Sequence, residues 1–189
     1  HEGVLNENSG EAEGIWQGNY RIIFRANTLL AAAQRITPAA GEQALYDQTV
    51  AEALTLRAFA YSRLLAYFGE DLEDEASLGT IVLDFPANAS TALPRTTVGD
   101  TYDFIFSDLQ RAETLFDAAG TSYNRFYVSQ RFVQGLRARV ANYRGDTNLA
   151  TSAANAVLST STLPATGSVA DYRSLWQDTS GAAANEVIF

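Results

Sequence analysis

The sequence predicts an all-α fold of stacked helical hairpins, an alpha-alpha superhelix with minor irregular or short-strand excursions. Apolar residues recur at steps of three and four over five segments, which is the periodicity of amphipathic helices. Glycines stand where several of these segments end. Because 47% of the 189 residues are hydrophobic and 19% are charged, the chain can bury a substantial core. We therefore expect one helical domain over residues 1–189.

Two long helices are predicted first, over 13–36 and 42–68. The first has a wide apolar stripe that contains Trp16 and Tyr20. The second is apolar nearly all round, so we expect it to be packed between other helices. Gly69 is the expected C-cap of the second helix.

The pattern changes over 70–95, which we interpret as an ordered excursion. It contains an acidic run at 70–75 and a possible short strand at 81–83. The acidic run lacks the alternating spacing and the glycine of an EF-hand loop, so a solvated loop is favoured over a Ca²⁺ site.

Three more helices are predicted in the second half. Thr97 is the expected N-cap of one that ends near Gly120, and the next runs from about Ser129 to Gly145. The last begins after Asp146 and ends near 158, and a short helical segment is expected over 172–176.

A tetratricopeptide-like repeat is indicated where these last helices meet. Tyr143, Gly145, Asp146, Ala150 and Ala154 have the spacing of the turn and second helix of such a unit. The glycine permits a tight turn, and the alanines let two helices approach closely. This pattern favours stacked hairpins over a closed four-helix bundle.

Composition excludes several classes of function. The formal charge of −9 and the absence of a basic cluster argue against nucleic acid as a partner. With no cysteine and with His1 as the single histidine, the chain cannot form a Ser-His-Asp triad or a Cys- or His-based metal site. No cofactor and no metal are expected. An enzyme would have to use a pair of carboxylates, but no acidic residue of the chain lies in a recognisable catalytic motif.

Five segments, in this order, resemble the SusD/RagB family of outer-membrane nutrient-binding lipoproteins of Bacteroidota. The segments are Trp16-x-x-x-Tyr20-x-x-Ile23-x-x-Ala26-Asn27, Ala51-Glu52-Ala53-x-x-Leu56-Arg57-Ala58 running to Tyr67-Phe68-Gly69, Arg95-x-x-Val98-x-x-Thr101-Tyr102-x-x-Ile105-x-x-Asp108-Leu109-x-x-Ala112, Leu136-x-Ala138-Arg139-x-x-x-Tyr143-x-Gly145-Asp146 and Asn185-Glu186-Val187-Ile188-Phe189.

The resemblance implies a tetratricopeptide-like helical scaffold that forms the first part of a longer protein. It implies non-catalytic binding of an oligosaccharide or polysaccharide at the extracellular face of the outer membrane. The membrane would be reached only through a lipid anchor outside this chain, and the ligand would pass to a TonB-dependent, SusC-type transporter. One alternative is a helical scaffold that only docks proteins, with the ligand site in the other half. A second alternative is a carboxylate-dependent carbohydrate-active enzyme.

The candidate ligand-binding residues are aromatic and amide side chains, which suit the C–H faces and hydroxyl groups of sugars. Trp16 and Tyr20 lie on an apolar stripe, which favours a core role for them, whereas Asn19 lies off it. Tyr123 and Asn124 belong to an aromatic cluster between helices, where packing is an equally good interpretation.

Polar residues on the apolar stripes are expected to have structural partners. Asn27 must satisfy its amide if it is buried, so we expect it to tie backbone between helices. Arg57 and Arg137 are expected to form ion pairs. The candidate carboxylates are Glu52, Asp108 and Glu113.

Overall fold

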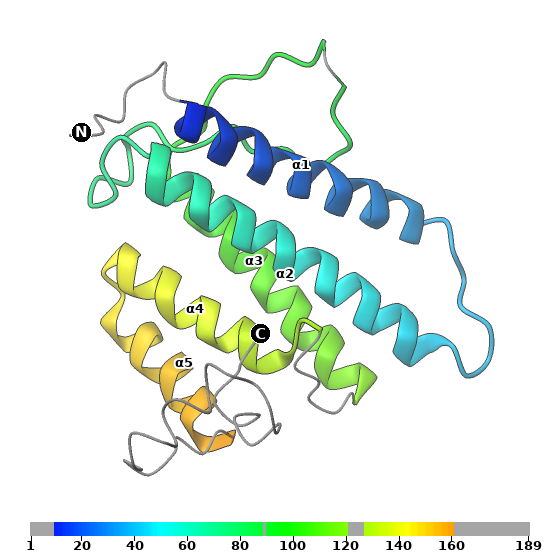
Figure 1. Cartoon of the computed structure of the whole chain (residues 1–189). Coiled ribbons are helices and arrows are strands. Elements are labelled where there is room, and N and C mark those ends of the chain that lie inside the picture. The colour runs from blue at the N-terminus through cyan, green and yellow to red at the C-terminus, as the bar shows by residue number, and fades with distance from the viewer. Residues whose placement is uncertain (1–9, 89, 121–126, 161–189) are drawn as a thin grey trace, which may run out of the picture. The chain divides into compact units, whose positions relative to one another are not determined.

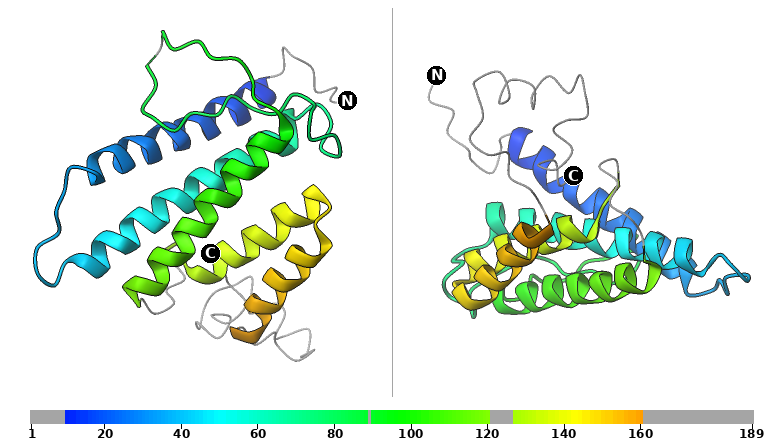
Figure 2. Two further views of the ribbon diagram at one scale, coloured as in Figure 1. Left: turned by 180° about the vertical axis from the view of Figure 1, so that it is seen from behind. Right: turned by 90° about the horizontal axis from the view of Figure 1, so that it is seen from below.

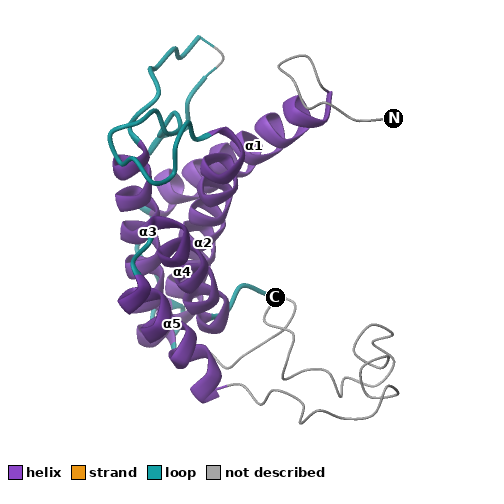
Figure 3. Cartoon of the chain, turned by 90° about the vertical axis from the view of Figure 1, so that its left-hand side faces the viewer, coloured by secondary structure: helices purple, strands orange, loops and turns teal. Residues whose placement is uncertain are grey.

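The computed structural model describes residues 10–88, 90–120 and 127–160 of the chain (Figure 1). All regular elements in these ranges are helices, as Figure 3 shows. They are α1 (Gly10–Ala33), α2 (Gln43–Phe68), α3 (Val98–Ala119), α4 (Gln130–Arg144) and α5 (Thr147–Thr160). The predicted all-α class is thereby confirmed. The expected helical segment at 172–176 lies outside the described residues.

The chain divides into two compact units, His1–Thr121 and Ser122–Phe189. The described part of the first unit contains α1, α2, α3 and the segment that joins α2 to α3. The described part of the second unit contains α4 and α5, which pack against each other.

In the first unit, α2 packs against both α1 and α3, and the two views of Figure 2 show it between them. Its buried side chains accordingly occur on both sides of the helix. Leu54, Tyr61 and Leu64 are inaccessible to solvent, as are Ile23 of α1 and Ile105 and Leu109 of α3. A helix that is apolar nearly all round must bury more than one face. The expectation that the second helix packs between other helices is confirmed, since α2 contacts both α1 and α3.

Helix ends follow the predicted capping residues. The side chain of Thr97 accepts a hydrogen bond from the Asp100 N–H at 3.0 Å, and Ser129 accepts one from the Phe132 N–H at 3.3 Å. Gly120 ends α3 in the left-handed conformation, with φ of 60°. Each cap satisfies backbone groups that a helix leaves without an internal partner.

The corner between α4 and α5 has the predicted turn chemistry. Gly145 has φ of 81°, and the N–H of Asp146 donates to the Ala141 carbonyl at 2.9 Å. The carboxylate of Asp146 accepts a hydrogen bond from the Leu149 N–H at 2.9 Å and so caps α5. A tight helical hairpin results.

Replacing Gly145 with valine is expected to lower the free energy of unfolding by about 1 kcal/mol or more. A β-branched residue is strained at positive φ, whereas glycine is not. Urea unfolding monitored by circular dichroism measures the change. Gly135→Ala is the matched control, because Gly135 lies inside α4 with no atom within 4 Å of an added Cβ. That control should gain about 0.5–1 kcal/mol, because alanine is the better helix former. An unchanged stability of Gly145→Val would contradict the strained-corner account.

In the segment between α2 and α3, the residues at 81–83 do not form the expected strand. The described segment contains one isolated antiparallel bridge, between Leu78 and Thr97. The backbone groups of Ile81 and Leu83 bind tyrosine hydroxyl groups instead of a neighbouring strand. This run of β-branched and apolar residues is therefore an extended segment that the side chains of Tyr20 and Tyr61 bind.

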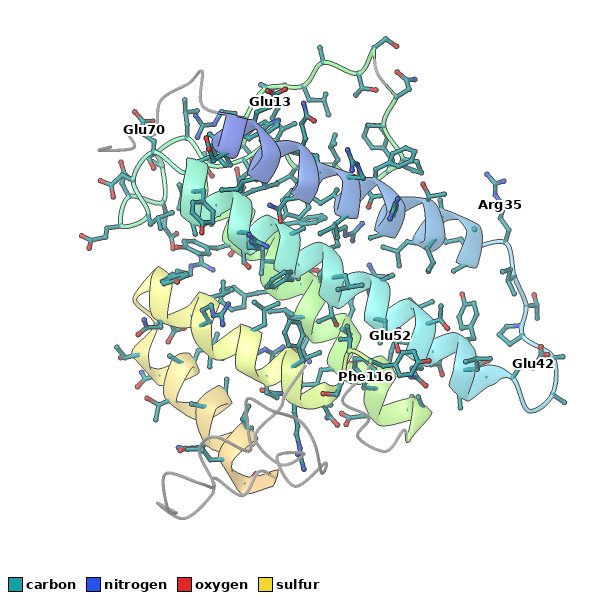
Figure 4. The ribbon with its side chains drawn as sticks, viewed as in Figure 1. Glu13, Arg35, Glu42, Glu52, Glu70 and Phe116 are labelled. Atoms are coloured by element: carbon teal, nitrogen blue, oxygen red, sulfur yellow. The ribbon has the colours of Figure 1, made fainter. Side chains whose placement is uncertain are left out.

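The acidic run is shaped by its own carboxylates. Asp71 accepts a hydrogen bond from the Glu73 N–H at 2.9 Å, and Asp74 accepts one from the Ala76 N–H at 3.0 Å. Glu70, labelled in Figure 4, accepts a hydrogen bond from the Leu78 N–H at 3.3 Å. Among the described residues, no three Asp, Glu, His or Cys side chains are grouped as metal ligands would be. In the same ranges, no helix is long and apolar enough to cross a membrane.

Candidate functional site

The predicted ligand residues of the first helix lie in the first half of α1. Asn19 is buried, with 3% of its surface exposed. Its amide donates to the Ile15 carbonyl at 2.7 Å, while its Oδ1 has no hydrogen-bond partner among the described residues. Trp16 and Tyr20 are half-buried. Tyr123 and Asn124 lie outside the described residues.

Trp16 and Tyr20 belong to an aromatic cluster with Phe68 at the end of α2. The rings of Trp16 and Tyr20 are 4.8 Å apart and tilted by 51°. The ring of Trp16 meets that of Phe68 edge-on, at 5.0 Å and 90°. These are the preferred geometries of packed aromatic side chains. The rings hold α1 against the end of α2, and they do not form a co-planar stacking surface.

Two tyrosine hydroxyl groups anchor the segment that follows the acidic run. The hydroxyl of Tyr20 donates to the Ile81 carbonyl and accepts from the Ile81 N–H, both at 3.0 Å. The hydroxyl of Tyr61 donates to the Leu83 carbonyl at 3.1 Å and accepts from the Leu83 N–H at 2.7 Å. Each hydroxyl thus replaces the partner strand that this extended backbone lacks.

Burial raises the pKa of the Tyr20 hydroxyl from 10.0 to about 12, although its backbone hydrogen bond and Arg95 oppose the rise. Burial also raises the pKa of Tyr61. In each case the folded chain holds the phenolic proton more firmly than the unfolded chain does. These hydroxyls therefore contribute stability that is fully present below pH 10, the unfolded value, and that is lost as pH rises from 10 toward 12.

We expect Tyr20→Phe to lose less stability than the unsubstituted protein between pH 10 and 12, because the variant has one fewer raised pKa. Urea unfolding at a series of alkaline pH values measures how steeply the free energy of unfolding of each protein falls with pH. Tyr67→Phe is the control, since Tyr67 is 57% exposed. Identical slopes for Tyr20→Phe and the unsubstituted protein would contradict the anchoring role of the Tyr20 hydroxyl.

Asn27, Arg57 and Asp108 form a buried polar network that joins α1, α2 and α3. The guanidinium group of Arg57 donates to both carboxylate oxygens of Asp108 at 2.7 Å and to Oδ1 of Asn27 at 2.6 Å. Arg57 and Asp108 are 4% and 2% exposed. The predicted ion pairing of Arg57 is confirmed, with Asp108 as its partner among the three candidate carboxylates.

The amide of Asn27 extends this network to residues 81–85, the anchored segment, which the hydroxyls of Tyr20 and Tyr61 also bind. It donates to the carbonyls of Leu83 and Phe85, both at 2.9 Å, which confirms the prediction that Asn27 ties backbone. Burial raises the pKa of the Asp108 carboxyl, and the hydrogen bonds from Arg57 oppose that rise. The bidentate geometry is the one that best offsets the desolvation of a buried pair.

Arg95 is a structural residue whose contacts no pattern in the sequence predicts. Its guanidinium group donates to the carbonyls of Gly79, Phe68 and Leu78, at 2.8, 2.5 and 2.9 Å. It therefore joins the end of α2 and residues 78–79 of the excursion to the segment just before α3. Thr97 indicated only that a helix begins near here, and such long-range partners leave no periodic pattern.

Residues 3–141 match the sequence profile of a SusD-like family described as "Starch-binding associating with outer membrane". No curated protein matches the chain.

Solved structures with the same fold include a SusD superfamily protein from Bacteroides thetaiotaomicron, with 25% identity and a TM-score of 0.68 over 78% of this chain and 33% of that one. A SusD-like carbohydrate binding protein from Bacteroides vulgatus has 19% identity and a TM-score of 0.76, over 88% of this chain and 34% of that one. A laminarin binding SusD-like protein has 20% identity and a TM-score of 0.65, over 88% and 34%. The chain spans about a third of the length of these structures. Because the family profile matches well over half of its residues, the chain belongs to the SusD-like family.

Proposed function

We propose that the protein to which this chain belongs binds a polysaccharide or oligosaccharide without transforming it. The observation that carries the proposal is the match of residues 3–141 to a family described as starch-binding and associated with the outer membrane. The structural similarity to a laminarin binding protein supports the same ligand class, since starch and laminarin are both glucose polymers. We further propose that binding occurs at the extracellular face of that membrane and that the ligand passes to a TonB-dependent, SusC-type transporter.

Within this chain, Trp16 is the first of the five proposed contacts to test. It is half-buried, so part of its indole ring is accessible to a ligand. The hydroxyl of Tyr20 already makes two hydrogen bonds, and Asn19 is buried. Asn19, Tyr20, Tyr123 and Asn124 remain proposed contacts.

The test is a titration of soluble starch and laminarin oligosaccharides, followed by tryptophan fluorescence and by an assay for new reducing ends. Trp16 and Trp176 are the two tryptophans of the chain, so a Trp176→Phe background makes the signal report on Trp16. Binding with no new reducing ends supports the proposal. Trp16→Phe, followed by calorimetry, is expected to weaken binding if the indole contacts the sugar. New reducing ends would contradict non-catalytic binding and support the carbohydrate-active enzyme.

A docking scaffold is the second candidate function, and the geometry of the aromatic cluster favours it. The rings of Trp16, Tyr20 and Phe68 pack against one another at steep angles, as core side chains do. Under this function the ligand site would correspond to the two thirds of the relatives' length that this chain does not span. A stably folded chain that binds none of the polysaccharides would support the docking scaffold over a site in this part of the protein.

A further inference from the structure

The first unit contains a pocket of about 270 Å³, and its lining does not include Trp16, Asn19 or Tyr20, the predicted ligand residues that the structure describes. It lies among α1, α2 and α3, with Asp84 of the anchored segment at its edge. Its lining includes Leu30, Gln34, Val50, Phe104, Ser107 and Arg111, together with the buried pair of Arg57 and Asp108.

The buried part of the lining is already satisfied. Arg57 and Asp108 neutralise each other through two hydrogen bonds, and the Arg57 guanidinium lies 4.9 Å from the centroid of the Phe104 ring. These groups give the pocket a polar floor without a net charge. A ligand entering it would not need to supply a counter-charge.

The exposed part of the lining has unused hydrogen-bonding capacity. The side chains of Gln34, Asp84, Ser107 and Arg111 are exposed and make no hydrogen bond or ion pair with any described residue. Asp84 and Arg111 carry opposite charges and line the same pocket, yet they do not pair with each other. Together the four side chains offer a carboxylate acceptor, a guanidinium donor, and an amide and a hydroxyl that both donate and accept.

We propose that this pocket binds one neutral polyhydroxyl unit of about the size of a monosaccharide. The charged lining residues, two arginines and two aspartates, sum to zero, which disfavours a ligand with a net charge. Hydroxyl groups both donate and accept, so they suit a carboxylate and a guanidinium that have no hydrogen-bond partner among the described residues. The pocket is smaller than the usual range for drug-sized molecules, about 300–1,000 Å³, and its lining is more polar than that of most such pockets, which suits a small polar ligand.

The choice of a sugar among neutral polyhydroxyl compounds rests on the proposed function. A zwitterionic amino acid is the competing ligand, because its ammonium and carboxylate groups would pair with Asp84 and Arg111. The sugar is favoured because its C–H groups also match the apolar side of the pocket, which Leu30, Val50 and Phe104 provide.

The test uses the whole 189-residue chain and D-glucose, D-galactose and D-mannose as probes, with glycine and L-alanine as competing ligands. Amide chemical shifts in NMR locate the binding and give its affinity. A sugar is expected to shift amides around Gln34, Asp84 and Ser107. Arg111→Gln and Asp84→Asn should each lower its affinity about tenfold, since each removes a hydrogen bond to a charged group. Arg21→Gln and Asp100→Asn, which change exposed residues outside the pocket, should leave it unchanged.

Three outcomes would overturn the inference: no shift at the pocket, equal weakening by the control variants, or tighter binding of the amino acids. Titrating starch and laminarin oligosaccharides with the same variants separates this inference from the proposed function. Oligosaccharide binding that survives without any monosaccharide binding at the pocket would overturn the pocket alone. Monosaccharide binding at the pocket without oligosaccharide binding by the chain would support the pocket and favour the docking scaffold over an oligosaccharide site in this part of the protein.

Discussion

Replacing Asp108 with alanine is expected to lower the free energy of unfolding by about 3–5 kcal/mol. The substitution leaves the guanidinium of Arg57 buried among α1, α2 and α3 without its carboxylate, and an uncompensated buried charge is among the most costly defects in a core. The loss also reaches the anchored segment, because Arg57 orients the amide of Asn27 that holds Leu83 and Phe85. Urea unfolding followed by circular dichroism measures the change.

Asp100→Asn is the matched control for a carboxylate on the same helix. Asp100 is exposed in the first turn of α3, so its loss should cost less than about 1 kcal/mol through the helix dipole. The double variant Arg57→Met, Asp108→Leu should recover part of the stability lost in Asp108→Ala, because it removes both charges at once. A loss below about 1 kcal/mol for Asp108→Ala would show that water reaches the guanidinium and that the network is not a structural anchor.

The helices were predictable because their signals are local. Thr97, Ser129, Gly120 and Gly145 cap helices where the sequence indicated, and each acts on backbone within a few residues of itself. The enclosed position of α2 followed from its all-round apolar pattern. The pairing of Arg57 was predictable in kind, because a guanidinium on a buried stripe needs a carboxylate.

The excursion and the candidate site depend on contacts between residues far apart in the chain. The residues at 81–83 have the composition of a strand, yet the hydroxyls of Tyr20 and Tyr61 take the place of a partner strand. Asn19 lies off the main apolar stripe, but the packing of α1 buries it all the same. The pocket at Asp84 and Arg111 is formed by three helices and a connecting segment, so no spacing in the sequence marks it.

Gly79→Ala is expected to lower the free energy of unfolding by about 1–3 kcal/mol. A Cβ at this buried position would overlap the Thr97 carbonyl oxygen and lie 2.6 Å from Oγ1 of Thr101. Neither atom can yield easily, because Thr97 caps α3 and Thr101 Oγ1 donates to the Thr97 carbonyl at 2.8 Å. The N–H of Gly79 also donates to the Thr96 carbonyl at 2.7 Å, so the overlap would push residue 79 away from the start of α3. Overpacking of this kind costs roughly the stated amount.

Gly18→Ala separates this overlap from the general effect of replacing a glycine. Gly18 lies inside α1, and an added Cβ there would meet no atom within 4 Å. Since alanine is the better helix former, this variant should gain about 0.5–1 kcal/mol. Thermal and urea unfolding of the two variants should therefore move in opposite directions. If Gly79→Ala were as stable as the unsubstituted chain, the backbone around Leu78 and Thr97 would have to relax freely. A backbone that relaxes freely there would also mean that the hydrogen bonds of Arg95 to the carbonyls of Phe68, Leu78 and Gly79 do not hold it rigidly in place.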